Sequence, residues 1–324
     1  MTNEKNLHIN VSSLGALAKH GIKKATVAIG VFDGVHKGHQ LLLKKLVKMA
    51  KKDNATPVAM TFYPHPKSVL RPETHPGLLF SPHKKVELLH EYGGKAVVTI
   101  PFTKDFAALS PQEFIEECLL APQVEIAGIC VGSNWRFGSE GKGDTRTLKD
   151  FAARGHFDFE SLEELIIDGE TVSSTLIRRA VSSGLLKKAE KLLGRPYSIS
   201  GEVERGKMIA GSTLSHPTAN IKTSCGIIPP NGVYAGWTEL EGKKYPTAIA
   251  VGVSPTFNYS DSDLPRVEAH LIDFHGDIYG KQIETFFVDY LREERCYAKP
   301  EDLKLQINED VENIKNMLKG KKYE

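Results

Sequence analysis

The chain has 324 residues, of which 40% are hydrophobic and 25% charged, so it has the composition of an ordinary globular protein and a length that two domains can share. Its 42 basic and 40 acidic residues give a formal charge of +2, which excludes an overall field that would favour nucleic acid or a membrane surface as partner. Any attraction for phosphate must therefore be local.

Targeting signals are not evident in the sequence. Met1 to Asn6 are polar and lack the apolar core of a signal peptide, and no run of about 18 apolar residues could form a membrane span. No two cysteines form a Cys-x-x-Cys pair, so we expect reduced, mostly buried thiols at Cys118, Cys130, Cys225 and Cys296. We expect a cytoplasmic protein that is a monomer or weak oligomer.

A strand, a tight loop and a helix are predicted near the start of the chain. The apolar run at residues 25–29 ends in glycine, and apolar side chains recur at helical spacing from Leu41 to Val47. Between them lies the loop GVFDGVHKGH, residues 30–39. In such a unit the free N–H groups of the helix's first turn form a seat for an anion at the carboxyl end of a parallel strand.

This loop has side chains suited to phosphate. His36 and His39 add donors for phosphate oxygens, and three glycines let the backbone approach a polyphosphate closely: Gly30, Gly34 and Gly38. The histidines could instead ligate zinc, but no second Cys or His cluster lies at ligand spacing nearby. Neither the G-x-x-x-x-G-K-S/T loop nor the G-x-G-x-x-G fingerprint is present, which disfavours a P-loop or classical dinucleotide fold.

Residues 30–39 resemble the His-x-Gly-His signature of the nucleotidyltransferase superfamily, in the form carried by bacterial bifunctional riboflavin kinase/FAD synthetases. The likeness covers nearly the whole chain, because later motifs follow in the family's order. It implies an FMN adenylyltransferase with ATP and FMN as substrates and Mg²⁺ as cofactor. It also implies catalytic roles for His36 and His39 and contacts to ATP by Gly30, Phe32, Asp33 and Gly38.

A second buried strand is predicted at residues 57–62, and it runs into a loop in which two prolines flank a histidine. From the residues alone this loop is either a rigid turn or part of a site. The resemblance implies that it borders the flavin and the triphosphate, with four candidate flavin-binding residues: Phe62, Pro64, His65 and Pro66.

Strands and helices alternate throughout this half of the chain. Ser81 and Pro82 begin a helix that ends at Gly93-Gly94, and further elements follow: a strand at 96–100, an amphipathic helix at 111–120 and a strand at 126–131. This alternation predicts a doubly wound parallel sheet.

The segment GSNWRFG, residues 132–138, places Trp135 and Phe137 in period-two alternation, which predicts a strand edge with two buried rings. The family has a similar segment, and the resemblance implies that Asn134 lies near the flavin.

Hydroxyl side chains at residues 173–175 are typical of a helix N-cap, and the helix is expected to contain Ala180, Val181, Leu185 and Leu186. Arg178, one turn into it, would add a guanidinium to the free N–H groups. The segment resembles the S-S-T-x-x-R motif that closes the ATP site in this superfamily, with the matching positions Ser174, Thr175 and Arg178.

The rhythm of the sequence changes near residues 193–197, where we place a domain boundary: 1–194 for the α/β nucleotidyltransferase domain with a Rossmann-like parallel sheet, and 195–324 for a riboflavin-kinase-like domain. Short apolar runs such as 232–237 and 247–253 predict a small antiparallel β-barrel. Residues 311–318 predict a closing helix whose Ile314 and Met317 pack on the barrel.

The second half resembles the family's riboflavin kinase module. In the motif PTAN, residues 217–220, the resemblance implies that Thr218 and Asn220 help to hold Mg²⁺ on nucleotide phosphates. It implies that Glu268 takes the proton from the ribityl 5′-hydroxyl of riboflavin. Residues 273–280 and 291–294 continue the likeness.

The loop before this motif departs from the family. Family kinases read Leu-Gly-Phe-Pro-Thr-Ala-Asn there, whereas this chain has Ser215-His216 in place of Gly-Phe, and Ala210 and Ser212 replace basic residues around Gly211. The hypothesis is that adenylyl transfer is intact and kinase activity is weakened or lost. Three alternatives stay open: a fully active bifunctional enzyme, another His-x-Gly-His adenylyltransferase such as one acting on a pantetheine phosphate, and a non-enzymatic flavin-binding protein.

Overall fold

A computed structural model describes residues 6–74, 77–204, 218–252, 266–295, 297 and 299–320. The chain divides into two compact units. The first holds most of the chain up to Ser173; the second holds the rest, together with the short upstream segment Gly77–Ser81. Apart from Gly77–Ser81, the second unit therefore begins at Ser174, before residue 194. The domain boundary placed at residue 194 from the sequence stays a prediction.

The first unit is built on a parallel six-stranded sheet, which confirms the predicted doubly wound architecture. The strand order is β1-β4-β3-β2-β5-β6. Their bounds are β1 (Leu7–Asn10), β2 (Lys24–Ile29), β3 (Thr56–Tyr63), β4 (Ala96–Pro101), β5 (Glu125–Gly132) and β6 (Asp158–Leu162). The order reverses between β2 and β5, so the carboxyl ends of these two strands form the usual ligand-binding edge of such a sheet.

Helices and turns connect these strands. The α-helices are α1 (Lys37–Lys52), α2 (Pro66–Leu70), α3 (Pro82–Glu91), α4 (Lys104–Ala108), α5 (Pro111–Glu113) and α6 (Thr145–Ala153). These connections also include the 3-10 helices η1 (Leu14–His20), η2 (Pro72–Thr74) and η4 (Ser139–Gly141), and the hairpin of β7 (Ile166–Ile167) with β8 (Glu170–Thr171). The helix expected at 111–120 is present, but its second part, η3 (Phe114–Leu119), is wound as a π-helix.

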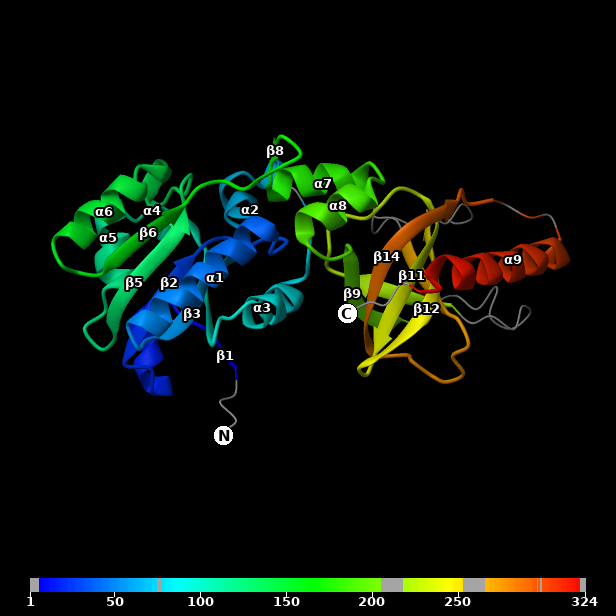
Figure 1. Cartoon of the computed structure of the whole chain (residues 1–324), viewed down its shortest axis with the longest axis horizontal. Helices are drawn as coiled ribbons and strands as arrows, with labels where there is room; N and C mark the ends of the chain where they lie inside the picture. Colours follow the sequence, from blue (N-terminus) through cyan, green and yellow to red (C-terminus); the bar gives the residue numbers. More distant parts are fainter. Residues whose placement is uncertain are drawn as a thin grey trace. The chain divides into compact units, whose positions relative to one another are not determined.

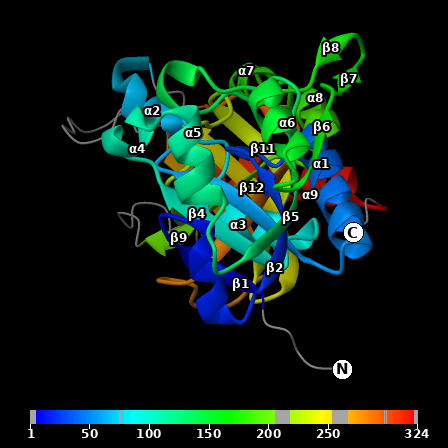
Figure 2. The same cartoon turned by 90° about the vertical axis from the view of Figure 1, so that its left-hand side faces the viewer.

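Both faces of the sheet are covered. Val27 and Ile29 of β2 point to a core that includes Leu17 of η1 and Phe114 of η3. Helix α1 packs on β2, β3 and β5 from the other side, where Cys130 of β5 lies against it. In Figure 2, α1 and α5 lie on opposite sides of the strands.

The second unit is a closed antiparallel barrel, as the sequence predicts. Its strands, in the order β10-β13-β12-β11-β14-β9, are β9 (Ser198–Glu204), β10 (Ala219–Thr223), β11 (Gly232–Leu240), β12 (Lys243–Gly252), β13 (Arg266–Leu271) and β14 (Gln282–Arg292). The helices α7 (Ser174–Ser182), α8 (Leu186–Leu193) and α9 (Pro300–Leu318) complete the unit, with α9 beside β11 and β12 (Figure 1).

Two helix predictions need correction. The single helix expected to include Leu185 and Leu186 is two helices, because the chain turns at Gly184 with a φ of +71° and leaves Leu185 exposed before α8 begins. The closing helix expected at 311–318 begins earlier, at Pro300.

Helix α9 is held on the barrel by apolar and ionic contacts. Ile314 is fully buried against residues of β11 and β14, and Met317 packs at the edge of this cluster. Arg292 of β14 donates from Nε and Nη2 to the carboxylate of Asp310, at 2.9 and 2.6 Å, and both side chains are largely buried.

The described cysteines are free and buried, as expected: Cys118, Cys130 and Cys225. Burial raises the pKa of the Cys130 thiol to about 12. The prediction for Cys296 lies outside the described residues. No helix of the described chain is both long enough and apolar enough to cross a membrane.

Candidate active site

The loop after β2 is folded back on itself. Phe32, Gly34 and Val35 have φ values of +54°, +82° and +37°, and such left-handed backbone in non-glycine residues is typical of functional loops. The fully buried ring of Phe32 lies over Gly30, where an added Cβ would come within 3.2 Å of it. A side chain at position 30 would therefore press on the Phe32 ring, so glycine suits this packing.

The two signature histidines lie at the start of α1. His36 is the N-cap residue, and its Nδ1 accepts a hydrogen bond from the backbone N–H of His39 at 3.4 Å. The imidazole rings stack with centroids 3.6 Å apart, and the ring of Phe32 meets that of His39 edge-on at 5.2 Å. Gly38 allows this arrangement, because a Cβ there would lie 3.2 Å from the His36 ring.

This geometry has a chemical consequence. Since Nδ1 of His36 accepts a hydrogen bond, the neutral imidazole carries its proton on Nε2, which remains a donor. The N-terminus of a 16-residue helix and an oriented imidazole donor thus lie at the carboxyl end of β2, where anionic groups are favoured.

Asp33 belongs to this loop, and a lysine that the sequence pattern does not reveal lies beside it. Asp33 is only 5% exposed. Lys85 of α3 donates to the backbone oxygens of Val31 at 3.3 Å and Phe62 at 3.2 Å, and to Oγ1 of Thr61 at 3.1 Å. Burial lowers the pKa of Lys85 to about 8, a shift that the charge of Asp33 partly opposes. The one signal in the sequence is that Lys85 precedes Leu88 and Leu89 by three and four residues, on the apolar side of the helix.

The proline-flanked segment follows β3 directly. Phe62 is buried in an aromatic cluster with Phe102 and Phe106, with ring centroids about 6 Å away, so its ring is part of the core. Pro64 follows Tyr63 through a cis peptide bond, and Pro66 is the first residue of α2. His65 caps α2, with its Nδ1 accepting from the backbone of Lys67 at 3.1 Å.

The segment at residues 132–138 is a turn and not the expected strand edge. Trp135 donates its backbone N–H to Gly132 O, and only Phe137 forms an isolated bridge, with Gly143. The two rings do stack, at 4.7 Å, and Phe137 is buried. Asn134 is exposed and donates from Nδ2 to Glu164 at 2.6 Å.

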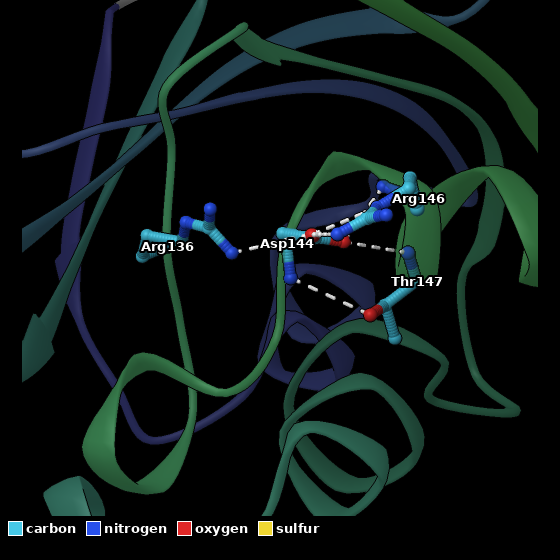
Figure 3. A network of polar contacts seen from close by, with 4 residues as sticks. All are labelled: Arg136, Asp144, Arg146 and Thr147. Atoms are coloured by element: carbon cyan, nitrogen blue, oxygen red, sulfur yellow. Dashed lines mark hydrogen bonds and ion pairs between the residues drawn. The ribbon is translucent and has the colours of Figure 1, made fainter.

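Arg136 of the same segment belongs to a polar network at the start of α6 (Figure 3). Asp144 caps the helix and accepts from the backbone N–H groups of Arg146 and Thr147. Arg136 and Arg146 both reach its Oδ2, at 3.2 and 3.1 Å. The hydrogen bond from Thr147 is the main reason why the pKa of Asp144 is lowered. Arg136, the basic residue of this segment, therefore interacts with the N-cap residue of α6.

The candidate triphosphate residues Ser174, Thr175 and Arg178 lie on α7, in the second unit. Arg178 is buried and donates from Nε to the backbone oxygen of Gly77 at 2.9 Å. Their predicted convergence with His36 and His39 of the first unit stays a prediction.

Gly77–Ser81 is tied to the second unit at further points. The hydroxyl of Tyr197 donates to Leu79 O at 3.2 Å, and Gly226 donates its backbone N–H to Leu78 O at 3.1 Å.

The barrel brings together the candidate kinase residues. Thr218 and Asn220 are two positions apart at the start of β10, a spacing that places side chains on the same face of a strand. Asn220 lies opposite Glu268 in the pairing of β10 with β13. Thr218 donates from Oγ1 to Oε2 of Glu268 at 3.4 Å. No group of three or more His, Cys, Asp or Glu side chains that could hold a metal occurs among the described residues. Two neutral oxygen donors nevertheless fit Mg²⁺, which often takes its remaining ligands from phosphate and water.

A second carboxylate, which the sequence pattern does not single out, lies near this site. Glu294 lies so close over Gly252 that a Cβ there would collide with its carboxylate. Burial, and next the charge of Glu268, raise the pKa of Glu294. The altered loop with Ser215 and His216 lies outside the described residues.

Two family models match the chain. One described as FAD synthetase matches residues 18–176, and one described as riboflavin kinase matches residues 193–318. The Bacillus subtilis (strain 168) bifunctional riboflavin kinase/FMN adenylyltransferase is 33% identical over 304 residues, which cover 93% of this chain and 95% of that protein. The protein of the same name from Escherichia coli (strain K12) is 34% identical over 287 residues, with coverage of 88% and 90%.

A solved structure is also similar. The crystal structure of a Streptococcus pneumoniae protein described as a macrolide-efflux protein matches with a TM-score of 0.76 and 29% identity, and covers 96% of this chain and 99% of that one.

Proposed function

The chain belongs to the family of bifunctional riboflavin kinase/FMN adenylyltransferases, and we propose that its first unit makes FAD by adenylyl transfer from ATP to FMN. An oxygen of the FMN phosphate attacks the α-phosphorus of ATP, and the bond to the leaving pyrophosphate breaks. The observation that carries this proposal is the stacked pair of His36 and His39 at the N-terminus of α1, on the ligand-binding edge of the sheet.

The side chains and backbone groups of this chain stabilise the charge that develops on the phosphate oxygens, and they position the substrates. The Nε2–H of His36 and the first N–H groups of α1 donate to phosphate oxygens on which charge develops, and preorganised donors of this kind often lower the barrier more than any other single effect. His39 is the second catalytic imidazole. ATP is further held by Gly30, Phe32, Asp33, Gly38, Ser174, Thr175 and Arg178. The flavin is bordered by Phe62, Pro64, His65, Pro66 and Asn134. Among these residues, Phe62 contributes from the core, because its ring is buried.

For the second unit we propose a riboflavin kinase site of reduced activity. Glu268 accepts the proton of the ribityl 5′-hydroxyl as that oxygen attacks the γ-phosphorus of ATP, and the bond from this phosphorus to the leaving ADP breaks. Thr218 and Asn220 supply oxygen ligands to Mg²⁺, which neutralises phosphate charge when bound. The replacement of Gly-Phe by Ser215-His216 in the preceding loop weakens nucleotide binding, because a Cβ where glycine is required costs about 1 kcal/mol or more.

A chromatographic product assay on the purified full chain tests both parts. The protein is incubated with ATP and Mg²⁺, once with FMN and once with riboflavin. FAD from FMN, with little or no FMN from riboflavin, is the expected result. Conversion of riboflavin through to FAD at comparable rates would show a fully bifunctional enzyme, and bound flavin without turnover of either substrate would refute both activities.

A further inference from the structure

A half-buried lysine joins the ends of two neighbouring strands at the proposed adenylyltransferase site. Lys85 reaches from α3 to the carboxyl ends of β2 and β3, where its ammonium group donates to Val31 O and Phe62 O and to Thr61 Oγ1. The hydroxyl of Thr61 in turn donates to Val31 O at 3.0 Å. One carbonyl, that of Val31, therefore receives both groups.

The position of that carbonyl matters for the signature loop. Val31 directly precedes Phe32, where the backbone takes its first left-handed turn, and the loop then leads through Asp33 to His36. Holding Val31 O on the neighbouring strand fixes the point from which the loop departs. A shift there would move the histidines and the first turn of α1 relative to the substrates.

The ammonium group is not available to a ligand in this arrangement. A lysine has three N–H donors, and its contacts at 3.1, 3.2 and 3.3 Å account for three protein acceptors. A direct phosphate contact, the usual role of a lysine in a nucleotide site, would break at least one of these bonds. The contacts therefore favour a role in placing other groups.

The charge at position 85 is partly removed from water. Leu88 and Leu89, on the same side of α3, are buried and apolar. Burial of the ammonium group also lowers the pKa of Lys85 to about 8. A desolvated ammonium group beside a signature loop is typical of a functional site.

We propose that Lys85 is a positioning residue for adenylyl transfer: through Val31 and Thr61 it holds the loop that presents His36 and His39. This inference rests on the proposed function of the first unit.

The test compares Lys85→Met with the wild type in steady-state conversion of FMN to FAD, with both proteins assayed well below their melting temperatures. We expect kcat to fall on the order of 100-fold, because a displacement of about 1 Å in a positioned group has effects of this size. The KM values for ATP and FMN should stay within about threefold, because substrate contacts are not removed. The matched control is Lys48→Met, which changes an exposed lysine of α1 and should leave both parameters unchanged.

A second variant separates this role from general packing. Thr61→Val removes the hydroxyl that links Lys85 to Val31 O, and we expect a smaller fall in kcat. In the double variant the two losses should be strongly non-additive, because both act through the same carbonyl. A kcat of Lys85→Met within about twofold of the wild type, or a raised KM for ATP at unchanged kcat, would overturn the proposal.

A readout without turnover tests the placement itself. The imidazole resonances of His36 and His39, assigned with single His→Ala variants, should shift in Lys85→Met and stay unchanged in Lys48→Met. Unchanged resonances in Lys85→Met overturn the proposal whatever the activity. If the wild type makes no FAD from FMN, the proposed function fails, and these resonances still decide whether Lys85 places the loop.

Discussion

The imidazole ring of His36 lies on that of His39, with centroids 3.6 Å apart and planes inclined by 17°. One ring caps the helix from which the other projects, so helix capping and ring stacking both link the two residues. The backbone of α1 and the ring of Phe32 place the pair.

Replacing His39 by alanine should affect turnover far more than folding. We expect kcat for FMN adenylylation to fall about 100-fold or more, as for the loss of a donor to developing charge, while the melting temperature changes little. Steady-state kinetics and thermal unfolding measure the two effects. The control His20→Ala removes an exposed imidazole and should change neither. A large melting shift at unchanged specific activity would show that His39 is only structural.

Glu268→Gln should abolish most riboflavin phosphorylation and leave FMN adenylylation intact. The amide keeps the size of the side chain and can still accept from Thr218, but it cannot take the proton of the attacking hydroxyl. The two reactions are measured separately by chromatography. Equal loss of both activities would mean that the substitution disturbs the whole chain and not one catalytic step.

Restoring the family's residues at the altered loop should raise kinase activity. The double variant Ser215→Gly, His216→Phe is expected to lower the KM for ATP in the riboflavin reaction several-fold, because it removes a Cβ where the family has glycine. The same variant should leave FAD formation from FMN unchanged. If the wild type already phosphorylates riboflavin efficiently and the variant is no better, the departure is neutral.

Breaking the ion pair that holds α9 should destabilise the second unit. Arg292→Met leaves the largely buried carboxylate of Asp310 without its partner, which costs about 3 kcal/mol of unfolding free energy. The double variant Arg292→Met, Asp310→Leu should recover much of this loss, because no charge is then left buried. Lys315→Met, which removes an exposed pair with Asp273, should cost less than about 1 kcal/mol. Urea denaturation gives all three values, and a double variant as unstable as the single one would contradict the prediction.

Lys85 should make the stability of the protein depend on alkaline pH. Its pKa is about 8 in the folded chain against 10.5 in the unfolded one, so between these values the unfolded state binds more protons and the contribution of Lys85 to stability rises with pH. The wild type should gain about 2 kcal/mol relative to Lys85→Met between about pH 7.5 and about pH 9.5.

His8 interacts with Lys85, and burial lowers the pKa of His8 from its usual value, away from this pH window. The difference in unfolding free energy between the two proteins, measured in urea at both pH values, isolates the lysine. A difference that stays constant with pH would show that Lys85 ionises as in the unfolded chain.

Much of the fold can be predicted because its elements have clear periodicity. Apolar runs at residues 25–29 and 57–62 are too short for helices and form β2 and β3, and the closely spaced short runs after residue 198 form the barrel. The apolar pattern predicts only the second half of α9, because Leu303, Leu305 and Ile307 in the first half alternate instead of following helical spacing. Pro300 at its first turn is nevertheless a start signal. Gly184, which separates α7 from α8, is likewise a helix-end signal.

The candidate site is harder to predict, because its contacts join distant parts of the chain. Lysine is usually solvated, so the sequence indicates only a charged residue near a helix start at position 85, and the fold alone shows that its ammonium group reaches β2 and β3. Arg178 and Gly77 are 101 positions apart, and no local pattern links them. The motif predicts Phe62 beside the flavin, whereas its burial against Phe102 follows from packing across the sheet.

The segment Gly77–Ser81 limits which chimaeras between this chain and its relatives can fold. It belongs to the second unit through Tyr197, Arg178 and Gly226, although the first unit continues after it in sequence. Recombination could replace all residues after Ser173 by the corresponding half of a relative. Gly77–Ser81 would then be kept from this chain, but the residues that it contacts would come from the relative. Chimaeras that fold should therefore have residues compatible with this segment in their second half, or take the segment from the same relative through a second crossover.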